Sequence, residues 1–266
     1  MKYCGFELNG QSHYGLVETV AGAEQITRLL LKPPEQNGGD IEDLPSKRMD
    51  HLALAEARLL VPVRPSKIVC VGRNYREHAA ELGNEVPGEP LLFFKPPSSL
   101  LASGGEIRRP KISQRIDFEG ELAVVIGKKC YKLGPDEDVR PYILGYTCLN
   151  DVTARDLQKK DGQWTRAKGF DTFCPVGPLV TDEIDPWSGV GVETRLNREL
   201  LQQGNTRDFI FSLDAMIRYI ADAMTLVPGD VIATGTPKGV GPLVAGDMIE
   251  ISLEGVGTLR NTVVDE

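Results

Sequence analysis

Three acidic residues at alternate positions open the run Asp117-Phe118-Glu119-Gly120-Glu121, which is followed by the apolar residues 122–126. Alternate residues of a β-strand share one face, so Asp117, Glu119 and Glu121 are expected to point the same way, about 7 Å apart. The ordinary alternative is a solvated strand face. The apolar continuation favours a strand inside a sheet, where carboxylates need a compensating positive charge. Oxygen ligands on a rigid strand suit Mg²⁺ or Mn²⁺ better than zinc.

A third acidic ligand is available where a polar run begins the next expected helix, at residues 152–160. Asn150 or Asp151 can cap this helix and Gly162 can end it. Asp151, Arg155 and Gln158 then lie at i, i+4 and i+7, on one helix face. The alternative is a plain cap with a surface Asp–Arg pair. An acid at the helix start with a cation and an amide behind it favours a functional site that includes Asp151.

His78 is the histidine best placed for acid–base chemistry. It lies in a short expected helix over residues 75–82, which Asn74 can cap and Gly83 can end. His78 and Glu81 are three residues apart and share a helix face, and a neighbouring carboxylate raises the basicity of an imidazole. The pair therefore suits a base that activates water, although an exposed helical pair is the alternative. His13 and His51 are expected to be structural or exposed.

Two lysines and one glycine-rich loop are candidates for holding an anion. Lys168 and Lys95 each stand in apolar surroundings and could hold a substrate carboxylate as a point charge. For Lys95 the favoured alternative is a buried stem with a solvated amine. The loop over residues 234–241, which contains Thr236, presents free N–H groups after a strand. It does not match the nucleotide P-loop, and it suits either a small carboxylate or a plain tight turn.

Composition excludes several classes of protein. The 266 residues carry a net charge of −8 with a pI near 5.1, which argues against a nucleic-acid partner. No apolar stretch is long enough to span a bilayer, and the first residues do not resemble a signal peptide, so we expect a cytoplasmic protein. Five cysteines without a C-x-x-C pair indicate neither a disulfide framework nor a thiolate zinc site.

The elements that must position these residues are mostly strands. Short alternating segments at residues 3–8 and 13–17 flank an Asn9-Gly10 turn, and Asn37-Gly38-Gly39-Asp40 reads as a loop. We predict a small β-rich domain over residues 1–60 and a catalytic domain over 61–266. Strands are expected at 116–126, 232–234, 248–253 and 258–263, and a helix with an apolar stripe at 212–223. The class is β-rich α+β.

Seven segments, in order over about residues 65–265, resemble the fumarylacetoacetate hydrolase superfamily: GRNYREHAAELG, FFKPPSSL, DFEGELAVVIGK, GYTCLNDVTARDLQ, RAKGFDTFCPVGP, TRLNRELLQ and ATGTPKGVG. The resemblance implies a mixed β-sandwich roll, a small extra N-terminal domain and a homodimer. Fumarylacetoacetate hydrolases themselves carry a further acidic ligand upstream of the catalytic histidine, where this chain reads Val71-Gly72-Arg73-Asn74. It is therefore more similar to acylpyruvase, oxaloacetate decarboxylase and 2-hydroxyhepta-2,4-diene-1,7-dioate isomerase members.

The same resemblance implies roles for individual residues. Glu119, Glu121 and Asp151 would be the Mg²⁺ or Mn²⁺ ligands, and His78 with Glu81 the dyad that activates water, on a lid segment that orders over substrate. The groups that contact substrate or orient the catalytic water would be Lys168, Arg155, Gln158 and Thr236.

The expected activity is hydrolysis of acylpyruvate C–C bonds or decarboxylation of oxaloacetate. Metal chelation of the 1-carboxylate and 2-oxo group would stabilise the enolate that both reactions form. One alternative is an isomerase of aromatic-acid breakdown, which uses the same enolate. Another is a non-catalytic metal- or ligand-binding protein, against which the combination of a base with three carboxylates argues.

Overall fold

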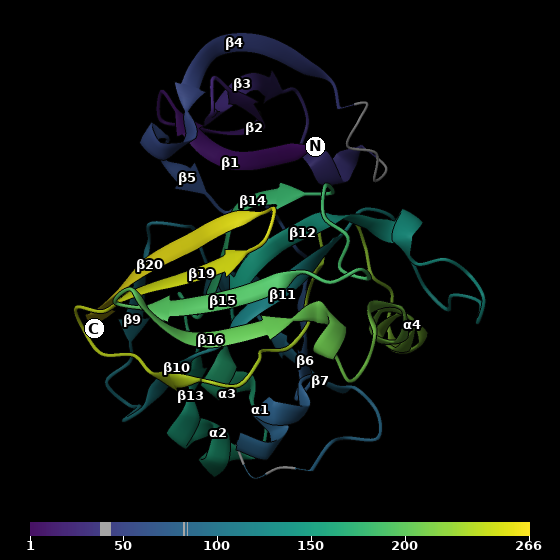
Figure 1. The fold of residues 1–266 in the computed structure, drawn as a ribbon, viewed down its shortest axis with the longest axis vertical. Helices are drawn as coiled ribbons and strands as arrows, with labels where there is room; N and C mark the ends of the chain where they lie inside the picture. Colours follow the sequence, from purple (N-terminus) through teal and green to yellow (C-terminus); the bar gives the residue numbers. More distant parts are fainter. Residues whose placement is uncertain (38–43, 82, 84) are drawn as a thin grey trace.

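The computed structural model describes residues 1–37, 44–81, 83 and 85–266 (Figure 1). The strands are β1 (Lys2–Leu8), β2 (Gln11–Val20), β3 (Ala23–Leu30), β4 (Ser46–Ala53), β5 (Leu59–Leu60), β6 (Ile68–Gly72), β7 (Leu91–Lys95), β8 (Leu100–Leu101), β9 (Glu106–Arg109), β10 (Ile116–Phe118), β11 (Gly120–Ile126), β12 (Ile143–Asn150), β13 (Thr153–Ala154), β14 (Cys174–Thr181), β15 (Gly191–Leu196), β16 (Glu199–Asn205), β17 (Val231–Ala233), β18 (Gly241–Pro242), β19 (Met248–Leu253) and β20 (Gly257–Asp265). The α-helices are α1 (Arg76–Glu81), α2 (Arg155–Asp161), α3 (Thr165–Lys168) and α4 (Leu213–Ala223). The predicted β-rich α+β class is confirmed.

Two sheets face each other and form the main body. The larger runs in the order β4-β3-β2-β1-β14-β12-β11-β17-β6-β7, and the smaller in the order β16-β15-β19-β20-β9. The smaller sheet lies over β11, β12 and β14, and α4 lies beside them (Figure 1). A third, short sheet of β13, β10 and β18 lies at the end of the molecule that carries α1, α2 and α3 (Figure 1).

Strand β11 is buried on both faces, as its apolar sequence predicts. Leu122, Val124 and Ile126 pack into the core between the two large sheets, which also contains the apolar stripe of α4. Ala123 and Val125 point the other way, into a second core cluster. This strand is therefore a rigid element in the middle of the protein.

Helix α4 matches its prediction closely. The Ser212 side chain accepts a hydrogen bond from the N–H of Ala215, which caps the first turn. Leu213, Met216, Ile217 and Ile220 are buried at helical spacing. Each such side chain contributes about 1.5–3 kcal/mol when it is fully removed from water.

The first 60 residues form the antiparallel strands β1 to β5. The predicted Asn9-Gly10 turn joins β1 to β2, with positive φ values of 53° and 74° at the two residues. Strand β1 also pairs with β14 through Lys2 and Tyr3, so the N-terminal strands extend the larger sheet. A domain boundary near residue 60 stays a prediction. Of the expected loop at 37–40, residues 38–40 lie outside the described residues.

The predicted single strand over residues 116–126 is wrong. The chain forms β10 and β11 in different sheets and changes sheet at Glu119. The side chains of Asn150 and Gln202 accept hydrogen bonds from the N–H groups of Glu119 and Gly120, replacing ladder partners at the break. Gly120 is needed because a Cβ there would meet the Thr194 hydroxyl at 2.1 Å. The close neighbour of Gly120 is thus a side chain of the facing sheet.

Two predicted helix starts are also wrong. Helix α2 begins at Arg155, and its first turn has no side-chain cap from Asn150 or Asp151; Gly162 ends it as predicted, with φ 71°. Asn74 does not cap α1, because its buried amide instead bonds to the backbone of Phe211 and Thr234. Leu82, the expected last residue of that helix, lies outside the described residues.

No helix in the described part of the chain is long and apolar enough to cross a membrane. The five cysteines are buried and free, so no disulfide joins them.

Candidate functional site

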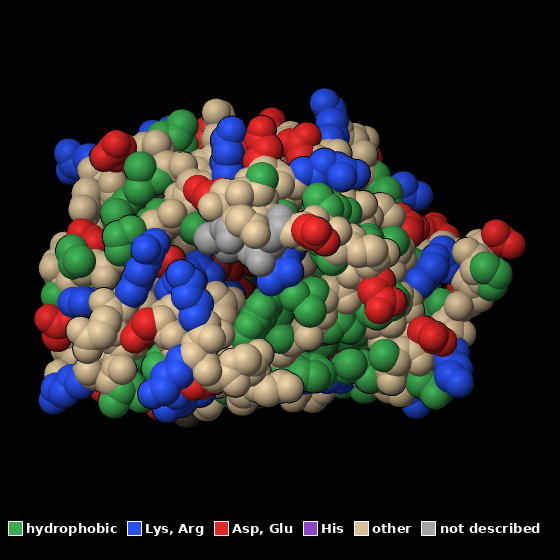
Figure 2. All heavy atoms as spheres, turned by 90° about the horizontal axis from the view of Figure 1, so that it is seen from below, with side chains coloured by type: hydrophobic (Ala, Val, Ile, Leu, Met, Phe, Trp, Pro, Cys, Tyr) green, Lys and Arg blue, Asp and Glu red, His purple; other side chains and the backbone are tan. Residues whose placement is uncertain are grey.

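A cavity lies at the end of the molecule that carries α1, α2 and α3. Figure 2 views this end and shows Lys and Arg side chains around a hollow, with acidic side chains inside it. Among the predicted site residues, the cavity is lined by His78, Glu119, Glu121, Asp151, Arg155, Gln158, Lys168 and Thr236. Residues far apart in the chain therefore meet here.

Sheet pairing brings the three predicted ligands together. In the antiparallel ladder of β11 and β12, Gly120 faces Asn150, so Glu119 and Asp151 lie just beyond the end of the same ladder. The N–H of Asp151 donates to the carbonyl oxygen of Glu119 at 2.9 Å. Asp151 is therefore placed by the end of β12 rather than by a helix start, which corrects the prediction for its local structure.

The three carboxylates fit a hard divalent cation. Glu119, Glu121 and Asp151 each offer an oxygen, these oxygens lie within 4.8 Å of one another, and all three side chains are buried. No other His, Cys, Asp or Glu joins this cluster in the described residues. An oxygen-only ligand set is the kind that Mg²⁺ and Mn²⁺ prefer.

Glu119 and Glu121 have opposite electrostatic environments. Burial alone would raise the pKa of Glu119, but the positive charges of Lys168 and Arg155 hold that pKa well below its usual range. Burial and the nearby Asp151 and Glu119 raise the pKa of Glu121 well above its usual range. Glu121 accepts a hydrogen bond from the N–H of Gly235 at 2.8 Å, and no lysine or arginine of the described residues pairs with it. Glu121 is therefore the ligand that most needs a cation.

Metal binding is expected to release a proton from Glu121. Because the pKa of this carboxyl is raised in the metal-free chain, a cation must displace its proton. The affinity for Mn²⁺ should rise with pH, by up to about tenfold per unit below that pKa, and level off above it. Calorimetric titration in two buffers with different ionisation enthalpies measures the protons released. An affinity that does not depend on pH, with no proton release, would contradict this assignment.

Two basic side chains balance the remaining acids. The Lys168 ammonium is buried at the end of α3 and lies 3.0 Å from Glu119 and 2.5 Å from Asp151. Burial would lower the pKa of Lys168, but Asp151 and Glu119 raise it. Arg155 donates to Glu119 at 2.5 Å, to Asp117 at 2.8 Å and to Gln158 at 2.8 Å. The Lys168 and Arg155 side chains thus both form ion pairs with the acidic cluster.

Lys95 lies elsewhere than predicted. Its ammonium is buried, so the favoured expectation of a solvated amine is wrong. It donates to Asp151 at 2.6 Å and to the carbonyl of Val152 at 3.1 Å, and it does not line the cavity. The reason is that β7 is paired with β6, which places Lys95 behind Asp151. Lys95 therefore contacts a candidate ligand rather than the substrate space.

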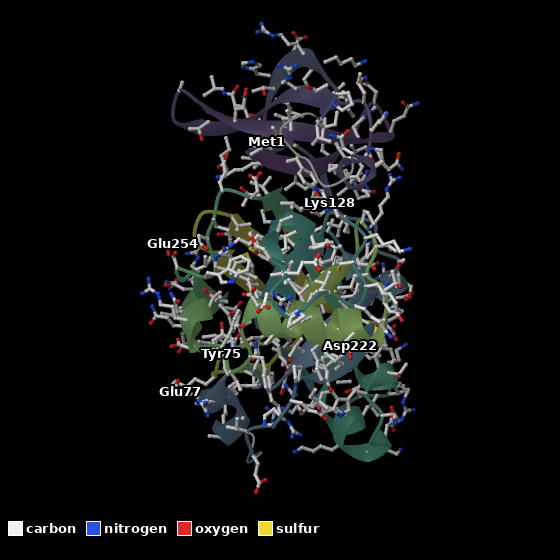
Figure 3. The ribbon with its side chains drawn as sticks, turned by 90° about the vertical axis from the view of Figure 1, so that its right-hand side faces the viewer. Met1, Tyr75, Glu77, Lys128, Asp222 and Glu254 are labelled. Atoms are coloured by element: carbon white, nitrogen blue, oxygen red, sulfur yellow. The ribbon has the colours of Figure 1, made fainter. Side chains whose placement is uncertain are left out.

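His78 and Glu81 face each other on α1, as their spacing predicts. The Nδ1 atom of His78 lies 3.4 Å from Glu81 Oε2. Glu81 also accepts from the N–H of Gly239 at 3.0 and 3.2 Å, which joins α1 to the loop after β17. Figure 3 shows Tyr75 and Glu77, at the start of this segment, at the opposite end of the molecule from Met1. The imidazole is therefore held by Glu81 on one side while it faces the cavity.

The Thr236 hydroxyl is already engaged. It donates to the carbonyl of Gly120 at 2.9 Å and accepts from the Gln202 amide at 2.8 Å. By contrast, the amide nitrogen of Gln158 has no hydrogen-bond partner in the described part of the chain. Gln158 therefore has donors free for a bound molecule, whereas Thr236 has no free hydroxyl proton.

Sequence reasoning missed the roles that Asp117, Gln202 and a pair of aromatic residues have in the site. Asp117 is fully buried and holds Arg155 and Arg115 at 2.8 Å each, so it orients a neighbour instead of a metal. Gln202 ties the sheet break to the 234–239 loop from the facing sheet, which no local pattern indicates. Phe93 and Trp164 form an apolar wall of the cavity, with ring centroids 5.2 Å apart. No local pattern in the sequence indicates that these two aromatic residues form the wall.

The chain matches one protein family and is similar in sequence to several named proteins. The family model described as fumarylacetoacetate (FAA) hydrolase C-terminal matches residues 67–264. The chain is 40% identical over 258 residues to oxaloacetate tautomerase YisK of Bacillus subtilis, covering 92% of this chain and 82% of that protein. It is 38% identical over 283 residues to 2,4-didehydro-3-deoxy-L-rhamnonate hydrolase of a Sphingomonas strain, covering 99% and 96%.

The solved structures give the same result for the fold. The crystal structure of 2-hydroxyhepta-2,4-diene-1,7-dioate isomerase from Mycobacterium marinum aligns with a TM-score of 0.87 at 38% identity, covering 100% of this chain and 99% of that one. The expected mixed β-sandwich roll and the resemblance drawn from seven segments are both confirmed. The chain belongs to the fumarylacetoacetate hydrolase family.

Proposed function

We propose that this chain is a Mg²⁺- or Mn²⁺-dependent enzyme that acts on small 2-oxo acids, by hydrolysing acylpyruvate C–C bonds or decarboxylating oxaloacetate. The observation that carries the proposal is the meeting of three buried carboxylates with the His78–Glu81 pair in one cavity. A protein that only binds a metal or ligand would not need a base beside the site. The named relatives, a tautomerase, a hydrolase and an isomerase, support an enzyme.

Glu119, Glu121 and Asp151 would hold the ion. When bound, a divalent cation supplies positive charge beside the 1-carboxylate and 2-oxo group and lowers the energy of an enolate at C3. Lys95 positions Asp151 from behind the site, because its ammonium is fixed between Asp151 and Val152. Lys168 and Arg155 keep Glu119 ionised, so that it is ready to bind the cation without losing a proton first.

His78 is the proposed base. With Nδ1 directed at Glu81, its Nε2 is free to accept a proton from water. Loss of that proton lets the water oxygen attack the C4 carbonyl of an acylpyruvate, and the C3–C4 bond breaks to give pyruvate enolate and a carboxylic acid. In oxaloacetate, loss of CO₂ leaves the same enolate, and no water attack is needed. Gln158, through its free amide, and the 234–239 loop that holds Thr236 orient the substrate or this water.

A second candidate is isomerisation or tautomerisation of a 2-oxo acid, which the names of the tautomerase and isomerase relatives favour. It would use the same enolate, with His78 moving a proton at carbon instead of activating water. The two candidate reactions share the cation site. They differ in the role of His78, which activates water in hydrolysis and moves a proton at carbon in isomerisation. From the family resemblance we also propose that the chain works as a homodimer in the cytoplasm.

A substrate panel tests the proposal. Purified protein with added Mn²⁺ is incubated with oxaloacetate, acetylpyruvate and a dienoic 2-oxo acid, and the products are identified. We expect turnover of at least one substrate that stops when a chelator is added and resumes with excess Mn²⁺. Pyruvate with acetate indicates hydrolysis, pyruvate with CO₂ indicates decarboxylation, and an unchanged mass indicates isomerisation. Full turnover in metal-free buffer would refute the proposal.

A further inference from the structure

One arginine of the cavity lining has no partner among the described residues. Arg73 lines the cavity together with Arg155 and Lys168. The latter two are paired with acids of the cluster. No carboxylate and no hydrogen-bond acceptor among the described residues contacts the Arg73 guanidinium. A charged group that lines a site without a partner is available to a ligand.

The backbone holds Arg73 at this place. Arg73 has φ 57°, in the left-handed region that favours glycine. Among the described residues that line the cavity, no other non-glycine residue has a positive φ. The conformation is enforced from both sides. Before it, β6 is paired with β7 and β17, and after it the buried Asn74 is bonded to Phe211 and Thr234. The arginine is thus fixed where a simple turn would take glycine or asparagine.

Arg73 lines both the cavity and a neighbouring surface depression. Glu89 and Asp222 line the neighbouring surface depression on its other side, yet neither pairs with it in the described chain. Asp222 lies on α4 (Figure 3). The cavity lining also contains Gly72, Phe93 and Trp164, which carry no charge. The carbon chain of a ligand can lie against these uncharged residues.

The charges of the cavity also fit a dianion. Its lining contains three acids, Glu119, Glu121 and Asp151, and three bases, Arg73, Arg155 and Lys168, which sum to zero. Behind the lining, the positive charge of the buried Lys95 and the negative charge of the buried Asp117 cancel. A divalent cation in the cluster would therefore leave a charge of +2. A 2-oxo acid with one carboxylate neutralises half of this charge, and one with two carboxylates neutralises all of it.

We infer that Arg73 binds a second, distal carboxylate, so that the preferred substrates are 2-oxo dicarboxylates rather than acylpyruvates with an uncharged end. This inference rests on the proposed function and narrows its substrate class. Arg73 acts as a specificity-determining residue of the cavity.

The test compares matched ligands on the Mn²⁺-loaded protein by calorimetry. Oxaloacetate is paired with 2-oxobutyrate, and 2-oxoglutarate with 2-oxopentanoate, since each pair has equal carbon number and differs in the distal carboxylate. We expect the wild type to bind the dicarboxylate of at least one pair roughly ten- to a hundredfold more tightly, the range for a hydrogen bond to a charged group. Arg73→Gln should reduce that ratio to below about threefold, and Arg73→Lys should retain part of it.

The variant Arg198→Gln is the matched control. Arg198 is exposed in the turn between β15 and β16 and also has positive φ, 75°, so the change alters charge and strain alike but far from the cavity. It should behave as wild type, and Mn²⁺ affinity should be unchanged in every variant. A wild type with no preference for dicarboxylates, or an Arg73→Gln protein that keeps the preference, overturns the inference. Metal-dependent turnover of acetylpyruvate that survives either result leaves the proposed function standing, whereas absence of all metal-dependent turnover refutes both.

Discussion

Glu121→Gln is expected to abolish Mn²⁺ binding and to lower turnover on the order of 10³-fold. Glu121 has no basic partner in the described chain, and burial with two neighbouring acids raises its pKa, so a bound cation is what stabilises its charged form. The charge of a catalytic cation contributes several kcal/mol, and about 1.4 kcal/mol corresponds to a factor of ten in rate. Calorimetry measures binding, and the panel of 2-oxo acids measures turnover.

The same substitution should not lower the stability of the metal-free protein, although it abolishes metal binding. A raised pKa in the folded chain means that the Glu121 carboxylate destabilises the metal-free protein increasingly as pH rises from the unfolded value toward the folded one. Glutamine resembles the protonated form, so Glu121→Gln should melt no lower than wild type in metal-free buffer at pH 8. Excess Mn²⁺ at 100 times its Kd should stabilise only the wild type, by about 2.7 kcal/mol.

A surface acid supplies the control for this pair of results. Glu193→Gln changes a half-buried carboxylate on β15 that pairs with Arg195, away from the cavity. It should leave Mn²⁺ binding and turnover as in wild type. If Glu121→Gln retained wild-type Mn²⁺ affinity, the cluster of three acids would not be the cation site.

His78→Ala is expected to lose on the order of 10²–10⁴-fold in hydrolysis, the usual contribution of a general base. The loss should fall on kcat, because His78 contacts Glu81 and faces the cavity without touching the acidic cluster through any hydrogen bond of the described residues. Mn²⁺ affinity should therefore remain within about threefold of wild type. Steady-state kinetics on acetylpyruvate and a Mn²⁺ titration measure the two quantities.

His51→Ala is the matched control, since His51 is exposed on β4 in the N-terminal strands. Glu81→Gln keeps the shape of the partner and removes its charge, so it should lower kcat less than His78→Ala does. Decarboxylation of oxaloacetate should decline less than hydrolysis in His78→Ala, because no water attack is needed. Intact hydrolysis in this variant would show that the base lies elsewhere.

Elements whose signals are local were predictable from the sequence. Residues 248–253 form β19 and residues 213–223 form α4, because alternation, helical spacing and the Ser212 cap all act within a few residues. The Asn9-Gly10 turn needs only the conformations of its own two residues. The seven motifs also identified the family, since they retain their order along the chain.

The fine structure of the site was not predictable in this way. Alternation that continues into an apolar run predicts one strand over residues 116–126, but β10 and β11 pair with different partners and separate at Glu119. Asp151 reads as a helix cap, yet its place comes from the register of β12 against β11. Lys95 reads as a solvated amine and is buried behind Asp151 because of the pairing of β7 with β6. Each error concerns a partner that is distant in the chain.

The residue types alone specify which chemistry is available: three carboxylates, a His–Glu pair and several basic side chains, each next to its own local structure. Which of these groups face one another depends on how distant segments pack in the fold. Pairing of β11 with β12 and β17 joins Glu119, Glu121, Asp151 and the N–H of Gly235 at one end of these three neighbouring strands. The physical reason is that strand register and burial are set by contacts between segments that lie far apart in sequence, whereas propensity and capping act only on neighbours.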